Sequence, residues 1–174
     1  MKAVVSTPGG ERWAELREIA EPEPGPGELL IEVHAAGINR GELTLVQIRD
    51  EFRPGQEVAG IVAAGPRQGE RVVGLADWHG WAEYAAVPEH RVVPLPDAID
   101  FRDFLGRDAV RIRTFFSAFY EDRAADNLRT LLGLVAEGRL AVKVGLETPL
   151  ADINDALDAL DARKVPGKAI LRVR

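Results

Sequence analysis

The 174-residue sequence contains no cysteine. This absence excludes disulfides, thiolate nucleophiles and every metal site that depends on cysteine ligands, and it fits a reducing cytoplasm. No apolar run approaches the roughly 20 residues that span a bilayer, and the opening MKAVVSTPGG has no long apolar segment before its Pro-Gly turn. We therefore expect a cytoplasmic protein without a membrane partner.

A concentration of one charge sign is also missing. The formal net charge of −6 comes from 28 acidic and 22 basic residues, and the two signs are interspersed along the chain. No basic face is available to neutralise phosphates, so we expect no nucleic-acid partner. The length, with 46% apolar residues, suits one compact domain.

Short apolar runs separated by Gly and Pro dominate the first 97 residues. Lys2 to Ser6 and Trp13 to Ile19 flank a Pro-Gly-Gly turn and predict a hairpin. Leu29 to Ala35 alternates apolar and polar residues, as a strand with one buried face does. Further runs occur in EVAGIV, VVGLA, WAEYAAV and RVVPL. Six or seven short strands in this space predict a β-barrel or sandwich.

The pattern changes in the second half, where two amphipathic helices are predicted. Asp126 to Gly138 has apolar residues at helical spacing, with Asp126 as candidate N-cap and Gly138 as the stop. Pro149 to Lys164 carries a second apolar stripe. VKVGL (142–146) and KAILRV (168–173) predict strands, and the last should close the sheet against the N-terminal strands. The fold class is therefore mainly β with α (α+β).

The segment Ile99 to Phe119 is harder to interpret. IDFRDF and VRIRTFF both alternate apolar and polar residues and predict two strands, separated by residues 106–108.

In the stretch Gly37 to Val62, polar residues lie just after the end of one predicted strand and at the start of the next. We call these two places the strand mouths. Asn39, Arg40 and Glu42 form a polar turn after one strand, and Gln56 and Glu57 open the next. Gly60, inside that next strand, indicates a close backbone approach or a bulge. These two mouths are the predicted floor of a site.

Several ordered segments resemble one known family. They are MKAVV, EPEPGPGELLIEVHAAGINRGEL, GQEVAGIV, GERVVGL, GWAEYAAVP and RVVPLPD, followed by LLGLVAEGRL, PLADINDALDAL and VPGKAILRV. Together they resemble the catalytic domain of the medium-chain dehydrogenase/reductase superfamily, in particular its zinc-independent quinone oxidoreductase-like branch. The resemblance implies a GroES-like β-barrel with two or more helices packed on it.

In that family a Rossmann domain lies between the two halves of the catalytic domain. Such a domain requires G-x-G-x-x-G after a strand, because backbone N–H groups at a helix N-terminus hold the pyrophosphate. No glycine of this sequence lies in that motif. We expect a single GroES-like domain over 1–174, built from 1–97 and 98–174 and joined near Asp97 where the nucleotide-binding domain would be inserted. Excision by engineering and natural loss both remain open.

The resemblance also assigns positions in the predicted site. Asn39 and Gln56 stand where zinc-containing relatives carry a cysteine and a histidine ligand, and because amides are poor zinc ligands we expect no metal. The resemblance implies that Asn39 hydrogen-bonds a nicotinamide or a substrate carbonyl, and that Arg40 contacts a cofactor pyrophosphate; a turn residue and a solvated loop arginine are the alternatives. Glu57 is expected to pair with an arginine such as Arg71, because an unpaired buried carboxylate is costly.

Other candidate residues carry weaker signals. The three histidines, His34, His79 and His90, share no metal-ligand spacing, so packing is favoured over catalysis. Trp78 and Trp81 are expected either to line a pocket mouth or to cap the barrel, and Tyr84 is expected in the core.

The function expected from these observations is that of the catalytic domain of an NADPH-dependent quinone or enone oxidoreductase-like enzyme. Without the nucleotide-binding domain this chain should bind no cofactor and be inactive alone, whereas intact relatives use NADPH and reduce a quinone or enone. The alternative is a non-enzymatic GroES-like binding or assembly module, and a homodimer through exposed apolar surface is a further expectation.

Overall fold

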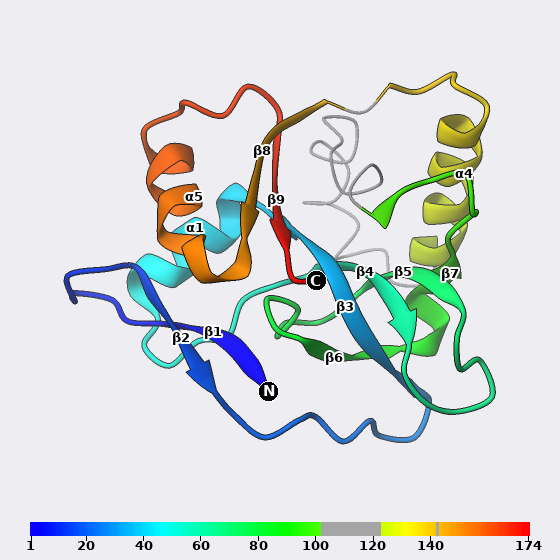
Figure 1. Ribbon diagram of the computed structural model, residues 1–174, viewed down its shortest axis with the longest axis horizontal. Helices are drawn as coiled ribbons and strands as arrows, with labels where there is room; N and C mark the ends of the chain where they lie inside the picture. The colour runs from blue at the N-terminus through cyan, green and yellow to red at the C-terminus, as the bar shows by residue number, and fades with distance from the viewer. Residues whose placement is uncertain (102–122, 142) are drawn as a thin grey trace.

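The computed structural model describes residues 1–101, 123–141 and 143–174 (Figure 1). The two strands predicted between Ile99 and Phe119 fall mostly on 102–122 and so lie outside the described residues.

Seven strands form within the first 97 residues, as the sequence predicts. They are β1 (Lys2–Ser6), β2 (Ala14–Glu18), β3 (Glu28–Ile38), β4 (Glu57–Val62), β5 (Arg71–Leu75), β6 (Tyr84–Pro88) and β7 (Val92–Pro94). The predicted hairpin is confirmed, because β1 and β2 pair antiparallel. Two more strands follow, β8 (Val144–Pro149) and β9 (Lys168–Arg172), and β8 extends further toward the C-terminus than the predicted 142–146.

The central strand of the larger sheet is β3. Within the described residues the strand order is β7-β5-β4-β3-β9-β8, and β6 also pairs with β3. β4 lies along one side of β3, whereas the other side pairs first with β6 and then with β9. The predicted closure of the last strand onto the N-terminal half is thus confirmed. The pair β8–β9 is parallel and the other pairs are antiparallel.

The α+β class is confirmed, but the described strand pairings do not form a closed barrel. The two ends of the strand order, β7 and β8, do not pair with each other in the described part of the chain. The parallel β8–β9 pair extends the sheet outward from β3 instead of returning to β7.

Gly60 lies where the backbone of β4 passes close to that of β3. The register between these strands shifts between Val33 and Ala35, opposite Gly60. A Cβ at residue 60 would lie 2.0 Å from the carbonyl oxygen of Glu32, which is backbone and cannot rotate away. The prediction of a close approach or bulge is confirmed.

Gly60→Ala should therefore lower the free energy of unfolding by about 1–3 kcal/mol, the usual cost of overpacking. Gly133→Ala is the matched control, because a Cβ there meets nothing within 4 Å and the residue lies inside a helix, α4 (Ala124–Ala136). The control should gain up to about 1 kcal/mol from helix propensity. Urea unfolding of both variants gives the comparison, and equal stabilities would contradict the close approach.

Three α-helices are present in the described residues, and one of them was not predicted. α1 (Arg40–Ile48) forms where the sequence suggested a polar turn, and it buries Leu43 and Val46, three residues apart, against the sheet. Its buried face carries only these two apolar residues beside the charged Glu42, too few for a clear apolar periodicity, which explains the error.

The two predicted helices are confirmed with shifted boundaries. α4 begins at Ala124 with Arg123 as the N-cap, so the prediction of Asp126 as N-cap is wrong; Asp126 lies in the first turn and pairs with Arg129 at 2.7 Å. A carboxylate in the first turn is favoured by the helix dipole as well as at the cap, so its position did not fix the boundary. The other helix, α5 (Ile153–Asp161), follows a 3-10 turn at Leu150–Asp152.

The helices lie on two sides of the sheet (Figure 1). α1 and α5 contribute Val46 and Leu157 to a buried cluster that also contains Trp81. α4 contributes Leu128 and Leu132 to a second cluster. No described helix is both long enough and apolar enough to cross a membrane.

Trp81 is a core residue and not part of a pocket mouth. Only 1% of Trp81 is exposed, and its indole N–H donates to the carbonyl of Gly37 at 3.0 Å. Trp78 is half-buried and meets Phe52 edge-to-face at 5.0 Å between ring centroids. Tyr84, predicted in the core, is also half-buried, and the Arg174 guanidinium lies over its ring.

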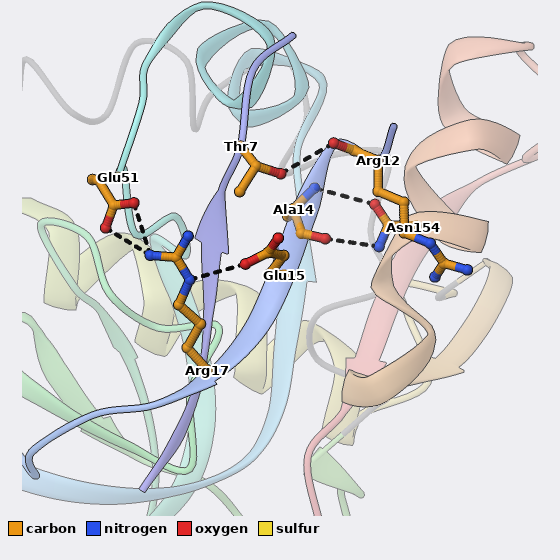
Figure 2. A network of polar contacts seen from close by, with 7 residues as sticks. All are labelled: Thr7, Arg12, Ala14, Glu15, Arg17, Glu51 and Asn154. Carbon is orange, nitrogen blue, oxygen red and sulfur yellow. Dashed lines mark hydrogen bonds and ion pairs between the residues drawn. The ribbon is translucent and has the colours of Figure 1, made fainter. Parts of the chain in front are cut away.

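The β1–β2 hairpin is fastened to elements far away in sequence (Figure 2). The Asn154 side chain of α5 accepts from the Ala14 N–H at 3.2 Å and donates to the Ala14 carbonyl at 2.9 Å. On the other side, the Arg17 guanidinium donates to both carboxylate oxygens of Glu51 at 2.7 and 2.8 Å. The hairpin thereby joins α5 to the loop before β4.

Candidate functional site

Asn39 and Gln56 lie at the same end of the sheet. Asn39 follows the last residue of β3 and is the N-cap of α1, and Gln56 directly precedes β4. β3 and β4 are antiparallel neighbours, so the end of one is beside the start of the other. The two predicted strand mouths therefore form one region.

One buried carboxylate holds these two mouths together. Glu42, in the first turn of α1, is 1% exposed. Its Oε2 accepts from the Asn39 backbone N–H at 2.8 Å, and its Oε1 accepts from the N–H groups of Gly55 and Gln56 at 2.9 and 3.0 Å. Sequence reasoning placed Glu42 in a turn without a role. The Asn-x-x-Glu spacing of a capping box is the signal that would have found it.

Burial raises the pKa of Glu42 to about 7, from a model-peptide value of 4.5. Desolvation is the main cause and the nearby Glu57 charge adds to it, while the hydrogen bond from the Asn39 N–H and the Lys168 charge act in the opposite direction. The carboxyl therefore changes its charge near neutral pH.

Glu57 pairs with Lys168 and not with Arg71. The Lys168 ammonium donates to Glu57 Oε2 at 2.7 Å and also to Asn39 Oδ1. The expectation of Arg71 is wrong because the β4–β5 register places Arg71 opposite Ile61, at the far end of β4 from Glu57. Arg71 instead donates to the carbonyls of Pro96 and Ile99.

The Lys168–Glu57 pair is desolvated. Glu57 and Lys168 are 4% and 9% exposed. A Cβ at residue 37 would lie 2.4 Å from Glu57 Oε2 and 3.1 Å from Lys168 Cε, so glycine at this point of β3 makes room for the pair. The second oxygen, Glu57 Oε1, is buried and has no hydrogen-bond partner among the described residues.

Arg40 contacts the far end of α5. Its Nη2 donates to the Leu160 carbonyl at 2.9 Å, so part of the guanidinium caps the C-terminal end of that helix. The predicted pyrophosphate contact stays a prediction. The other N–H groups of the Arg40 guanidinium would have to make it.

The three histidines occupy separate places. His34 lies in β3 and contacts Phe101 at 4.7 Å between ring centroids, His79 lies beside Arg53, and His90 belongs to the 3-10 turn η1 (Glu89–Arg91). Burial lowers the pKa of both His34 and His79. The described residues contain no group of three or more His, Asp or Glu side chains arranged to hold a metal.

A cavity of about 480 Å³ lies elsewhere, between the β1–β2 turn, α5 and the end of α1. Its lining includes Trp13, Asp155 and Asp158 but neither Asn39 nor Gln56. It is therefore separate from the strand mouths.

Comparison with known proteins gives two family matches. Residues 25–97 match the alcohol dehydrogenase GroES-like domain, and residues 68–171, more than half of the chain, match the zinc-binding dehydrogenase family.

Curated relatives match part of this chain. The synaptic vesicle membrane protein VAT-1 homolog-like of Mus musculus is 34% identical over 116 residues, which is 59% of this chain and 28% of that protein. The quinone oxidoreductase of Homo sapiens is 34% identical over 111 residues, covering 54% of this chain and 33% of the relative. The chain thus spans about a third of the length of these relatives.

Solved structures share the fold. The human VAT-1 homolog-like protein superposes with a TM-score of 0.81 at 19% identity, covering 100% of this chain and 98% of the other. A mycobacterial protein solved in complex with NADPH superposes with a TM-score of 0.78 at 16% identity, covering 99% of this chain and 100% of that one.

Proposed function

Because the chain belongs to the zinc-binding dehydrogenase family of the medium-chain dehydrogenase/reductase superfamily, we propose that it is the substrate-side domain of an NADPH-dependent quinone or enone oxidoreductase-like enzyme, without the nucleotide-binding domain. One of its curated relatives is a quinone oxidoreductase by name, and one neighbour in fold was solved with NADPH.

The observation that carries the proposal is the joint positioning of Asn39 and Gln56. Three backbone N–H groups from the two strand mouths donate to the Glu42 carboxylate. These bonds fix the backbones that carry the two amide side chains relative to each other. Neutral amide donors on a rigid frame suit the recognition of a carbonyl oxygen. A quinone and an enone both present such an oxygen.

Zinc, which the family name implies, does not fit these residues. The Asn39 side-chain oxygen and one oxygen of Glu57 already accept from the Lys168 ammonium. Zinc prefers thiolate, imidazole or carboxylate ligands in tetrahedral number, and the described strand mouths do not supply that set. We propose that this chain works without zinc.

We propose that this chain does not hold a whole NADPH molecule by itself. A helix N-terminus favours a pyrophosphate through its free N–H groups, and at α1 one of them, the N-cap N–H of Asn39, already donates to the Glu42 carboxylate. Asn39 remains suitable for a nicotinamide amide or for a substrate carbonyl. We therefore propose that this domain forms one side of a cleft. In a complete enzyme the dinucleotide would supply the hydride, and this domain would orient the acceptor.

The chain alone should not oxidise NADPH above background in the presence of 1,4-naphthoquinone or 2-cyclohexenone, because nothing holds the hydride donor. Absorbance at the NADPH band and titration calorimetry with NADPH measure this. The human quinone oxidoreductase is the positive control for the assay. Turnover, or micromolar binding of NADPH, would contradict the missing cofactor site.

The same proposal predicts that 2-cyclohexenone shifts the side-chain amide signals of Asn39 and Gln56 in ¹⁵N-labelled protein. Cyclohexene, which lacks the carbonyl, is the matched ligand control and should leave them in place. If the enone moved only signals elsewhere, the site at the strand mouths would be wrong.

The internal join is part of the proposal. It is supported by the absence of a G-x-G-x-x-G motif and by the family match, which continues past residue 97 into β9. Both engineering and natural loss would produce such a chain. Homodimerisation also remains a prediction; the large apolar side chains exposed in the described part are Ile48 and Val144. Light scattering over a concentration series tests it.

A further inference from the structure

Lys168 connects the last strand to the candidate site. It is the first residue of β9, and the antiparallel register pairs Ile38 with Ala169, which brings Lys168 beside Asn39. Its ammonium donates to Asn39 Oδ1 and, at 2.7 Å, to Glu57 Oε2. Both charged side chains are more than nine-tenths buried, so little water competes for these hydrogen bonds.

This contact decides which way the Asn39 amide faces. An ammonium group has three donors and no acceptor, so the amide atom that meets it must be the oxygen. The NH₂ group of Asn39 then points away from Lys168. It makes no hydrogen bond within the described residues, and Asn39 is only half-buried, so this donor is available to a ligand.

Glu57 fixes the ammonium in turn. One oxygen of the carboxylate accepts from Lys168, and the other has no hydrogen-bond partner among the described residues. Lys168 is therefore the one described cation that pairs with this buried charge. Glu42 holds the Asn39 backbone from the other side. Asn39 is thus held through its side chain by Lys168 and through its backbone by the Glu42 carboxylate, and the capping box also brings its side chain to the Glu42 backbone.

We propose that Lys168 is a positioning residue: it orients the Asn39 amide so that the NH₂ group is the hydrogen-bond donor for the carbonyl oxygen of a ligand at the strand mouths. This deepens the proposed function and rests on it for the identity of the ligand. Asn39 and Lys168 are 129 residues apart, so the orientation depends on the docking of β9.

The first test uses the ligand-free protein and needs no activity. In ¹³C,¹⁵N-labelled protein, Lys168→Met should shift the Asn39 side-chain ¹³Cγ signal upfield, because the carbonyl loses a charged donor, and Lys168→Arg should restore most of the shift. Lys164→Met removes an exposed ammonium on the segment before β9 and is the matched control. An Asn39 signal unchanged in Lys168→Met would overturn the proposal.

The second test measures the donor itself. Asn39→Asp keeps the shape and an acceptor for Lys168 but removes the NH₂ group, so it should remain folded even if Lys168→Met does not. We expect its affinity for 2-cyclohexenone, read from backbone shifts of neighbouring residues, to fall about threefold to tenfold, the effect of one hydrogen bond. Cyclohexene binding, where present, should not change.

The outcomes separate the two proposals. Enone binding to the wild type with the same affinity in Asn39→Asp would overturn the donor role and leave the proposed function standing. Absence of enone binding to the wild type would overturn the proposed function and the donor role together, while the ligand-free ¹³Cγ shift would still decide whether Lys168 orients the amide.

Discussion

Replacement of Glu42 by alanine should lower the free energy of unfolding by more than about 3 kcal/mol, since three backbone N–H groups lose their acceptor and each such loss costs about 1–3 kcal/mol when buried. The groups are those of Asn39, Gly55 and Gln56, all in or near the core. Chemical unfolding measures the loss. A change below 1 kcal/mol would show that water or a shifted backbone replaces the carboxylate.

The same residue predicts a pH dependence with a definite sign. Glu42 has a folded pKa of about 7 against 4.5 in model peptides, so the folded protein binds this proton more tightly than the unfolded chain. Its contribution is fully present below pH 4.5 and is lost as the pH rises to about 7 and beyond, by up to about 3 kcal/mol at 1.36 kcal/mol per pKa unit. Glu57 and Lys168 are the charged groups that face it.

Glu42→Gln should remove this part of the slope, because the amide does not titrate in this range. Glu23→Gln, at an exposed position, is the matched control and should keep the wild-type slope. Unfolding free energies at several pH values between 4.5 and 8 provide the comparison. Equal slopes in the wild type and Glu42→Gln would contradict the raised pKa.

The second large effect is expected at the Lys168–Glu57 pair. Lys168→Met should cost about 3–5 kcal/mol, because the Glu57 carboxylate, 4% exposed, would be left as a buried charge without its cation. Replacing both residues by methionine removes both charges. The double variant should therefore be more stable than Lys168→Met alone. Its loss of unfolding free energy should be far smaller than the sum of the losses in the two single variants.

An exposed pair provides the comparison for this cycle. Asp126 and Arg129 lie at a similar distance, 2.7 Å, but their side chains are 77% and 57% exposed. Solvent screening should limit their coupling to below about 1 kcal/mol. Similar coupling energies in the two cycles would mean that burial does not strengthen the Lys168–Glu57 pair.

Local patterns in the sequence predicted most of the secondary structure. Alternation along Leu29 to Ala35 and the apolar spacing after Asp126 each need only neighbours within about ten residues, and both elements formed. The errors occurred where local signals were weak. α1 buries only two apolar residues beside the charged Glu42, whereas α5, of the same length, buries four, so α1 showed no clear helical period. A carboxylate at Asp126 fitted a first turn as well as a cap.

The candidate site was predicted in part. Asn39 and Gln56 were found because polar residues follow or open apolar runs, and the structure brings their strand mouths together. The group that joins them, Glu42, was visible as Asn-x-x-Glu spacing, but its bonds to Gly55 and Gln56 depend on how the loop returns. The partner of Glu57 was assigned to Arg71, because sequence alone does not give the β4–β5 register.

The sequence by itself determined the class of the protein: the strands, the two helices of the second half, the family, and the lack of a dinucleotide motif all follow from residue order. Only the tertiary structure decided that Glu42 binds the backbone of both strand mouths and that Lys168 donates hydrogen bonds to Glu57 and Asn39. The reason is distance along the chain. Lys168 lies 111 residues from Glu57, and their contact exists only because β9 docks on β3 in one register, at a point where glycine leaves room for two buried charges.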